Sequence, residues 1–139
     1  MLSSAIALTG IMVAVLVAVP CSGEEELIGV PGGWQRKNVG DEAIYEELAH
    51  YAISKQVDNR EFFDTVLELL EVQTQVVAGI NYRIKFKTAE STCRITEAYS
   101  KEACQPKSPQ AVKDICTAEV VEGVGNVRTI LSFTCQGSS

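Results

Sequence analysis

Residues 80–87 alternate without exception between apolar and polar side chains, and this pattern constrains the fold more than any other in the chain. Successive side chains of a β-strand point to opposite faces of a sheet. One face carries the apolar side chains of Ile80, Tyr82, Ile84 and Phe86, and the other carries Asn81, Arg83, Lys85 and Lys87. The pattern predicts a half-buried strand with one face on the core and the other in solvent.

An uncharged segment with small apolar side chains comes directly before this strand. It consists of Gln75, Val76, Val77, Ala78 and Gly79. Hairpin tips are normally polar, so an apolar tip indicates that another surface covers it. Glycine lets the chain turn sharply or approach a second backbone closely. The alternative interpretation is a glycine bulge inside a buried strand.

The first 23 residues contain no Asp, Glu, Lys or Arg. Their apolar run, residues 5–19, is shorter than the roughly 20 residues that a bilayer span needs, and it ends in Pro20-Cys21-Ser22-Gly23. This pattern predicts a secretory signal peptide over residues 1–23 and a single secreted, extracellular domain over residues 24–139. We expect no membrane attachment after cleavage. A lipid anchor on Cys21 and a retained membrane anchor are the alternatives.

Four cysteines remain after the signal peptide, namely Cys93, Cys104, Cys116 and Cys135. In a small secreted domain this number indicates two disulfides, and three pairings are possible. The sequential pairing, Cys93 with Cys104 and Cys116 with Cys135, is favoured because the second pair brackets a strand–turn–strand. A zinc site is the competing interpretation, but the chain has no C-x-x-C pair and its one histidine is distant in sequence. We therefore expect no metal.

Periodicity divides the rest of the mature chain into one helix and about five strands. Helical spacing runs from an N-cap at Asp41 to about Val57, with His50 on the exposed side. Strand patterns cover residues 62–75, 80–88, 94–99, 116–121 and 127–135, with a polar break at 58–61, a loop at 100–113 and a turn at 123–126. The arm over residues 24–38 is expected to be flexible. The sequence predicts an α+β fold in which an antiparallel sheet wraps around one long helix.

Composition and motifs argue against several functions. A net charge of −6 makes nucleic acid a poor partner. An enzyme would need a nucleophile and a base, but every mature cysteine is expected to be paired. The Gly123-Val124-Gly125 segment is no nucleotide-binding loop because no helix follows it. We expect neither catalysis nor a cofactor.

Three features together resemble the secreted, two-disulfide (type 2) cystatins. They are the Gly32-Gly33 arm before the helix, the Gln-x-Val-x-Gly run over residues 75–79, and the four C-terminal cysteines. The chain is most similar to the salivary cystatins of blood-feeding arthropods, in which Gly-Gly-Trp and Gln-Thr-Gln-Val-Val-Ala-Gly runs are familiar. The resemblance implies reversible, tight-binding inhibition of papain-like cysteine proteases, such as cathepsins L, S or C, by a monomer.

The resemblance also implies which residues bind the protease. The arm residues Val30, Pro31, Gly32 and Gly33 would occupy the non-primed subsites, and residues 75–79 would cover the catalytic cysteine. The second hairpin, residues 122–126 with Gly123, Val124 and Gly125 at its centre, would touch the primed side. The family usually carries Pro-Trp at this second tip, and this chain has neither residue there. We therefore expect narrowed selectivity that favours cathepsin L-type proteases, and a cystatin-fold binding protein without inhibition is the alternative.

Asn59 is a candidate for a second binding site. Some cystatins inhibit legumain through an asparagine in the loop after the helix, and Asn59 falls at the matching place, 16 residues before Gln75. Its neighbours are Asp58 and Arg60, whereas the inhibitory pattern is Ser-Asn-Asp. The alternative is an ordinary turn asparagine, because asparagine tolerates the left-handed backbone conformation.

Overall fold

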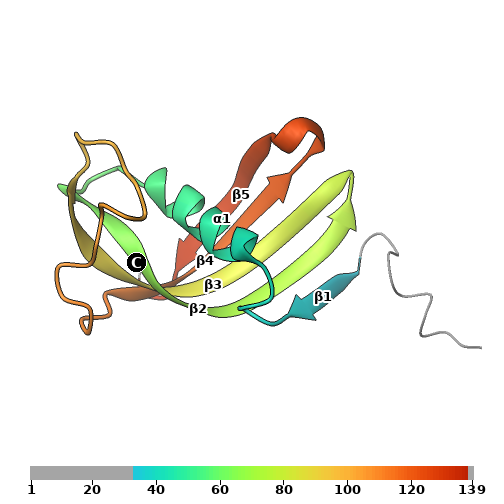
Figure 1. Cartoon of the computed structure of the whole chain (residues 1–139), viewed down its shortest axis with the longest axis horizontal. Helices are drawn as coiled ribbons and strands as arrows, with labels where there is room; N and C mark the ends of the chain where they lie inside the picture. Colours follow the sequence, from blue (N-terminus) through green and yellow to red (C-terminus); the bar gives the residue numbers. More distant parts are fainter. Residues whose placement is uncertain (1–32, 138–139) are drawn as a thin grey trace, which may run out of the picture. The chain divides into compact units, whose positions relative to one another are not determined.

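The computed structural model describes residues 33–137 of the chain. A five-stranded antiparallel sheet with the strand order β1-β2-β3-β4-β5 lies against one helix, α1 (Figure 1). The elements are β1 Trp34–Lys37, α1 Ala43–Ser54, β2 Phe62–Val77, β3 Gly79–Arg94, β4 Asp114–Glu122, a short 3₁₀ turn Val124–Asn126, and β5 Arg128–Cys135. The α+β fold class predicted from the sequence is confirmed.

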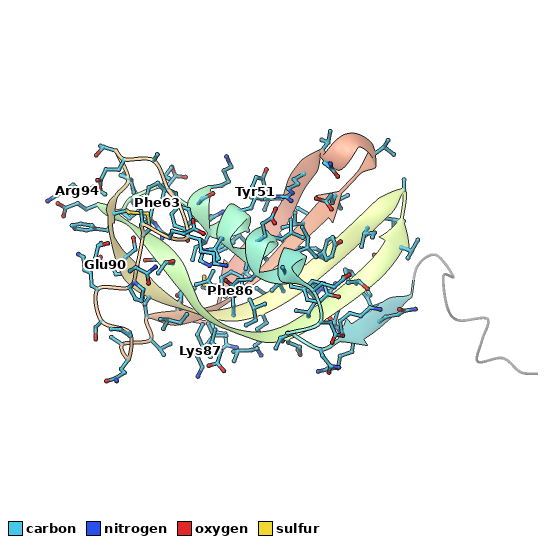
Figure 2. All side chains as sticks on the ribbon, in the orientation of Figure 1. Tyr51, Phe63, Phe86, Lys87, Glu90 and Arg94 are labelled. Carbon is cyan, nitrogen blue, oxygen red and sulfur yellow. A yellow bond between two sulfur atoms is a disulfide. The ribbon has the colours of Figure 1, made fainter. Side chains whose placement is uncertain are left out.

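The core lies between α1 and the inner face of the sheet. The helix buries one face that includes Tyr45, Leu48 and Ile53. Against it pack side chains of four strands, namely Val72, Tyr82, Ile84, Phe86, Cys116, Ala118, Val120, Ile130 and Phe133. Figure 2 shows Phe86 on the helix side of the sheet and Lys87 on the opposite, outer side. The half-buried strand predicted from the alternation is confirmed for residues 82–87, whereas at its start Ile80 is 39% exposed and Asn81 is buried.

Strand β2 has apolar residues on both faces because its pairing with β3 is interrupted three times. The register shifts lie between Phe62 and Asp64, between Val66 and Glu68, and between Leu69 and Glu71. The second and third shifts each place one extra residue on β2, which reverses its inside–outside alternation, and the first places two extra residues on β3. Bulges also increase the local twist. The bulges therefore let a 16-residue strand curve around the helix.

Two predictions are wrong, one for the arm and one for the segment after β3. Residues 34–37 of the supposedly flexible arm form β1, which pairs with residues 72–75 of β2. The strand predicted at 94–99 does not form, since β3 runs to Arg94 and the chain then turns. The Glu97 side chain accepts a hydrogen bond from the Arg94 amide at 2.6 Å, and the Glu97 amide donates to the Arg94 carbonyl at 2.9 Å, which closes this turn.

The helix is shorter than predicted. Its N-cap is Glu42 rather than Asp41, and no side chain caps its first turn. It ends at Ser54, whose hydroxyl donates to the Tyr51 carbonyl at 2.7 Å. A hydroxyl bonded back to the preceding turn competes with the helical ladder, so the helix stops three residues before Val57.

Both disulfides follow the sequential pairing, which is confirmed. Cys116 and Cys135 are direct partners across β4 and β5, and Cys116 belongs to the main core. Cys93 and Cys104 form a second, smaller cluster with Phe63, which lies beside the 95–113 loop. The small domain therefore has a covalent crosslink in each of its two apolar clusters.

His50 is buried, so the prediction that it lies on the surface is wrong. Its Nδ1 atom shares a 2.5 Å hydrogen bond with the Tyr99 hydroxyl, which also lies 3.0 Å from the Thr65 hydroxyl. Glu46 on the helix and Lys101 and Glu102 on the loop are the charged groups around it. Burial lowers the pKa of His50. The histidine thus joins α1 to the disulfide-bonded loop as a neutral side chain.

Candidate functional site

Three segments converge at one end of the sheet. The β2–β3 tip and the β4–β5 tip point to this end, and β1 begins there as well (Figure 1). Gly33 is exposed and directly precedes Trp34, which pairs with Gln75 just below the first tip. Val30, Pro31 and Gly32, like the expected signal peptide, lie outside the described residues. The structure thus brings Gly33, residues 75–79 and residues 122–126 together at one end of the sheet, and these are the described residues that the resemblance implied for protease binding.

The first tip is exposed and apolar. The turn occurs at Ala78, because Val77 pairs with Gly79 across it. Val76 and Val77 retain 43% and 40% of their accessible surface. A bulge within a buried strand, the alternative interpretation of this segment, is therefore wrong.

Gly79 fixes the two tips against each other. Its φ of +114° lies in the left-handed region, where residues with a side chain are strained. A Cβ atom on Gly79 would lie 2.5 Å from the Glu122 carbonyl oxygen and 2.9 Å from the Gly123 Cα. The backbone of the first tip therefore touches the backbone at the start of the second tip.

The second tip is a tight turn without a large side chain. The Gly123 amide donates to the Val127 carbonyl at 2.8 Å, and Gly125 and Asn126 both have positive φ, at +78° and +61°. Val124 is 92% exposed. This tip offers Val124 and the adjacent Val127, which is 63% exposed, to a partner, with no aromatic anchor.

An ion-pair bridge fastens the second tip to the helix. The Arg128 guanidinium lies 3.0 Å from the Glu122 carboxylate and 2.6 Å from the Glu47 carboxylate of α1. The hydrogen bonds to these two carboxylates raise the pKa of Arg128. Local sequence patterns could not predict this contact, since Glu47 and Arg128 are 81 residues apart. The ion pairs hold the base of the second hairpin against α1, while Val124 in the turn remains exposed.

Asn59 lies at the other end of the sheet, three residues before β2 begins. It is exposed, with a φ of +57°. Asp64 holds the turn over residues 58–61 through Arg60. Its carboxylate lies 2.7 Å from the Arg60 guanidinium and 2.9 Å from the Lys113 ammonium group. Figure 2 shows Phe63 and Arg94 at this same end, away from the two tips. Asn59 and the two tips therefore lie at opposite ends of the sheet.

One group of side chains within residues 33–137 has the composition of a metal site. Asp114 lies near Cys116 and Cys135, but both sulfur atoms belong to a disulfide, and a disulfide is no thiolate ligand. In this part of the chain no helix has the length and apolar character needed to cross a bilayer.

Several known proteins are similar to this chain in sequence and in fold. Residues 35–125 match the cystatin domain family. Mialostatin from Ixodes ricinus is 45% identical over 127 residues, or 89% of each chain, and salivary cystatin-L from Ixodes scapularis is 43% identical over 114 residues, or 79% of this chain and 85% of that one. The crystal structure of mialostatin, a gut cystatin, matches with a TM-score of 0.72 and 47% identity over 77% of this chain and 100% of that chain. A salivary cystatin from the soft tick Ornithodoros moubata matches with a TM-score of 0.72 and 42% identity, over 77% and 99% of the two chains.

Proposed function

This chain belongs to the cystatin family of cysteine protease inhibitors, and we propose that it blocks cathepsin L-type endopeptidases with the three segments at one end of its sheet. It is an inhibitor rather than an enzyme. The first tip would cover the catalytic cysteine of the protease, the arm residues 30–33 would lie in the non-primed subsites, and the second tip would touch the primed side. The observation that carries this proposal is the exposed, uncharged first tip, with Val76 and Val77 at its end.

Burial of the first tip gives a favourable free energy of binding. Fully burying an exposed valine contributes roughly 1.5–3 kcal/mol, so the two fifths of Val76 and Val77 still exposed would contribute about 1 kcal/mol each. The contact between Gly79 and the second hairpin holds the tip in place before binding. A preorganised tip loses little conformational entropy in the complex, so most of this contribution is retained.

The second tip supports a narrowed selectivity. Tryptophan is a typical interface anchor that contributes about 2 kcal/mol or more, and here the tip presents Val124 between two glycines. The primed side would therefore add little affinity. Proteases with an open cleft, such as cathepsin L, would be inhibited better than cathepsin B, whose cleft is partly occluded.

We also propose that the protein acts outside the cell as a monomer. The uncharged residues 1–23 support cleavage of a signal peptide, and two disulfides within residues 33–137 suit an oxidising compartment. The named relatives include gut and salivary proteins.

Inhibition constants of the mature protein, residues 24–139, test the proposal. The panel should contain cathepsins L, S, C and B, with trypsin as a serine protease control. We expect cathepsin L to be inhibited at least about tenfold more tightly than cathepsin B, the ratio that a 1.4 kcal/mol difference gives. Equal inhibition of cathepsins L and B would refute the selectivity. No inhibition of any cathepsin would favour a cystatin-fold binding protein.

Legumain inhibition through Asn59 is a second candidate function. The exposed, left-handed Asn59 and the Arg60–Asp64–Lys113 ion pairs beneath it support it, although such an asparagine is also common in ordinary turns. Asn59→Gly keeps the backbone conformation and removes the side chain. Loss of legumain inhibition in this variant, with cathepsin L inhibition intact, would support the second site. Equal legumain inhibition by both proteins, or none by either, would refute it.

A further inference from the structure

The outer face of the sheet carries a stack of Trp34 on Arg83 that the proposed inhibition does not use. The guanidinium carbon of Arg83 lies 4.0 Å from the centroid of the Trp34 ring. Trp34 pairs with Gln75, and Arg83 pairs with Gln73 on the opposite side of β2, so the two side chains meet across β2. A guanidinium at this distance over an indole ring is attracted by the negative face of the ring.

Side chains from the neighbouring strands hold Arg83 in the stacked position. The Glu119 carboxylate of β4 lies 3.5 Å from its Nε atom, and the Gln73 side-chain oxygen of β2 accepts a hydrogen bond from its Nη1 atom at 3.4 Å. The Glu119 carboxylate also accepts a hydrogen bond from the side-chain amide of Asn81 at 3.1 Å. Arg83 is thus fixed by two neighbours apart from Trp34.

The hydrogen bonds around Arg83 continue through Asn81 to Gln75 at the base of the first tip. The side-chain amide of Asn81, a buried residue, also donates a hydrogen bond to the Gln75 side-chain oxygen at 3.4 Å. Gln75 in turn pairs with Trp34 across the strands. The exit of the arm and the base of the first tip therefore share one set of contacts.

Apart from the stack, strand β1 is held by its pairing with β2 and by an ion pair of Arg36 with Glu71 at 3.6 Å. It consists of four residues at the edge of the sheet and pairs only with β2 among the described strands. Trp34 is its first residue and follows Gly33 directly. The stack therefore acts at the point where the arm leaves the sheet.

We propose that Arg83 is a positioning residue that holds Trp34 and, through it, directs the N-terminal arm along the protease cleft. This inference rests on the proposed function, because only a bound arm gives Arg83 an effect on affinity. Arg83 itself lies on the outer face of the sheet and would make no contact with the protease.

Tests without any protease come first. Trp34 is the sole tryptophan of the chain, so its fluorescence reports on the stack directly. Arg83→Ala should shift the emission, increase quenching by acrylamide, and speed amide hydrogen exchange over residues 34–37. Arg83→Lys keeps the charge but loses the planar stack, so it should show the same changes in weaker form. Lys85→Ala removes a cation two residues further along the same face and should change neither signal.

Inhibition of cathepsin L then tests the effect on the arm. Arg83→Ala should raise the inhibition constant about fivefold in the mature protein, and should have no effect in a variant that begins at Gly33. Lys85→Ala should leave both constants unchanged, and melting temperatures confirm that each variant is folded.

Two results would overturn the proposal. Unchanged fluorescence and exchange in Arg83→Ala would show that Arg83 does not hold Trp34. An equal loss of affinity with and without the arm would show that Arg83 contacts the protease directly. Failure of the parent protein to inhibit any cathepsin would refute the proposed function instead, and the fluorescence and exchange would still decide whether Arg83 holds β1.

Discussion

Val77→Asp tests the role of the first tip. Val77 is 40% exposed, so an aspartate there is solvated in the free protein and the free energy of unfolding should change little. In the complex, the protease would cover the new carboxylate without a charged partner. Desolvating an unpaired charge costs several kcal/mol. At 1.4 kcal/mol per tenfold, the inhibition constant should rise by at least about 100-fold.

The assay compares inhibition constants for cathepsin L with melting temperatures. Val112→Asp is the matched control, since Val112 is 48% exposed and lies in the loop before β4, outside the proposed interface. The control should inhibit like the parent protein. If Val77→Asp also inhibited like the parent, the first tip would not be the contact surface. If it unfolded the protein, the tip would be part of the core.

Three further changes test the framework behind the tips. Gly79→Ala should reduce the free energy of unfolding in urea by about 2 kcal/mol or more, because alanine is strained at positive φ and its Cβ would collide with the second hairpin. Gly40→Ala is the control and should be close to neutral, because a Cβ there meets open space. Equal effects of the two substitutions would refute the contact between Gly79 and the second hairpin. Burial lowers the pKa of His50 in the folded protein, so below about pH 6.5 the unfolded chain binds a proton more readily than the folded one, and the free energy of unfolding should fall as the pH falls. His50→Gln should flatten this pH dependence of the free energy of unfolding in urea. An unchanged slope would contradict the argument. Joint replacement of Cys116 and Cys135 by serine should cost about 3 kcal/mol for a separation of 19 residues, and calorimetry showing the melting temperature of the parent would exclude that contribution.

Local patterns predicted the elements whose side chains alternate strictly. Residues 80–87 form a strand because Tyr82, Ile84 and Phe86 are needed on the core side. Strand β1 could not be predicted in this way, because residues 34–37 become a strand only through pairing with β2. The strand predicted over residues 94–99 does not form because Glu97 closes a turn with Arg94 there.

The candidate site was predictable only in part. The composition of residues 75–79 indicated an apolar tip, because hairpin tips are otherwise polar, but the exposure of Val76 and Val77 was needed to exclude a bulge in a buried strand. The contacts that support the two tips join residues far apart in sequence, such as Glu47 with Arg128. They depend on strand registers that bulges shift by one or two residues, and periodicity alone does not give these registers.

Amide hydrogen exchange of the mature protein, free and bound to catalytically inactive cathepsin L, tests most directly whether this end of the sheet is the binding surface. We predict protection at residues 75–80, at 122–127 and before Trp34, with exchange at residues 58–61 unchanged. Protection at residues 58–61 with unchanged exchange at both tips would contradict the proposed mode of inhibition.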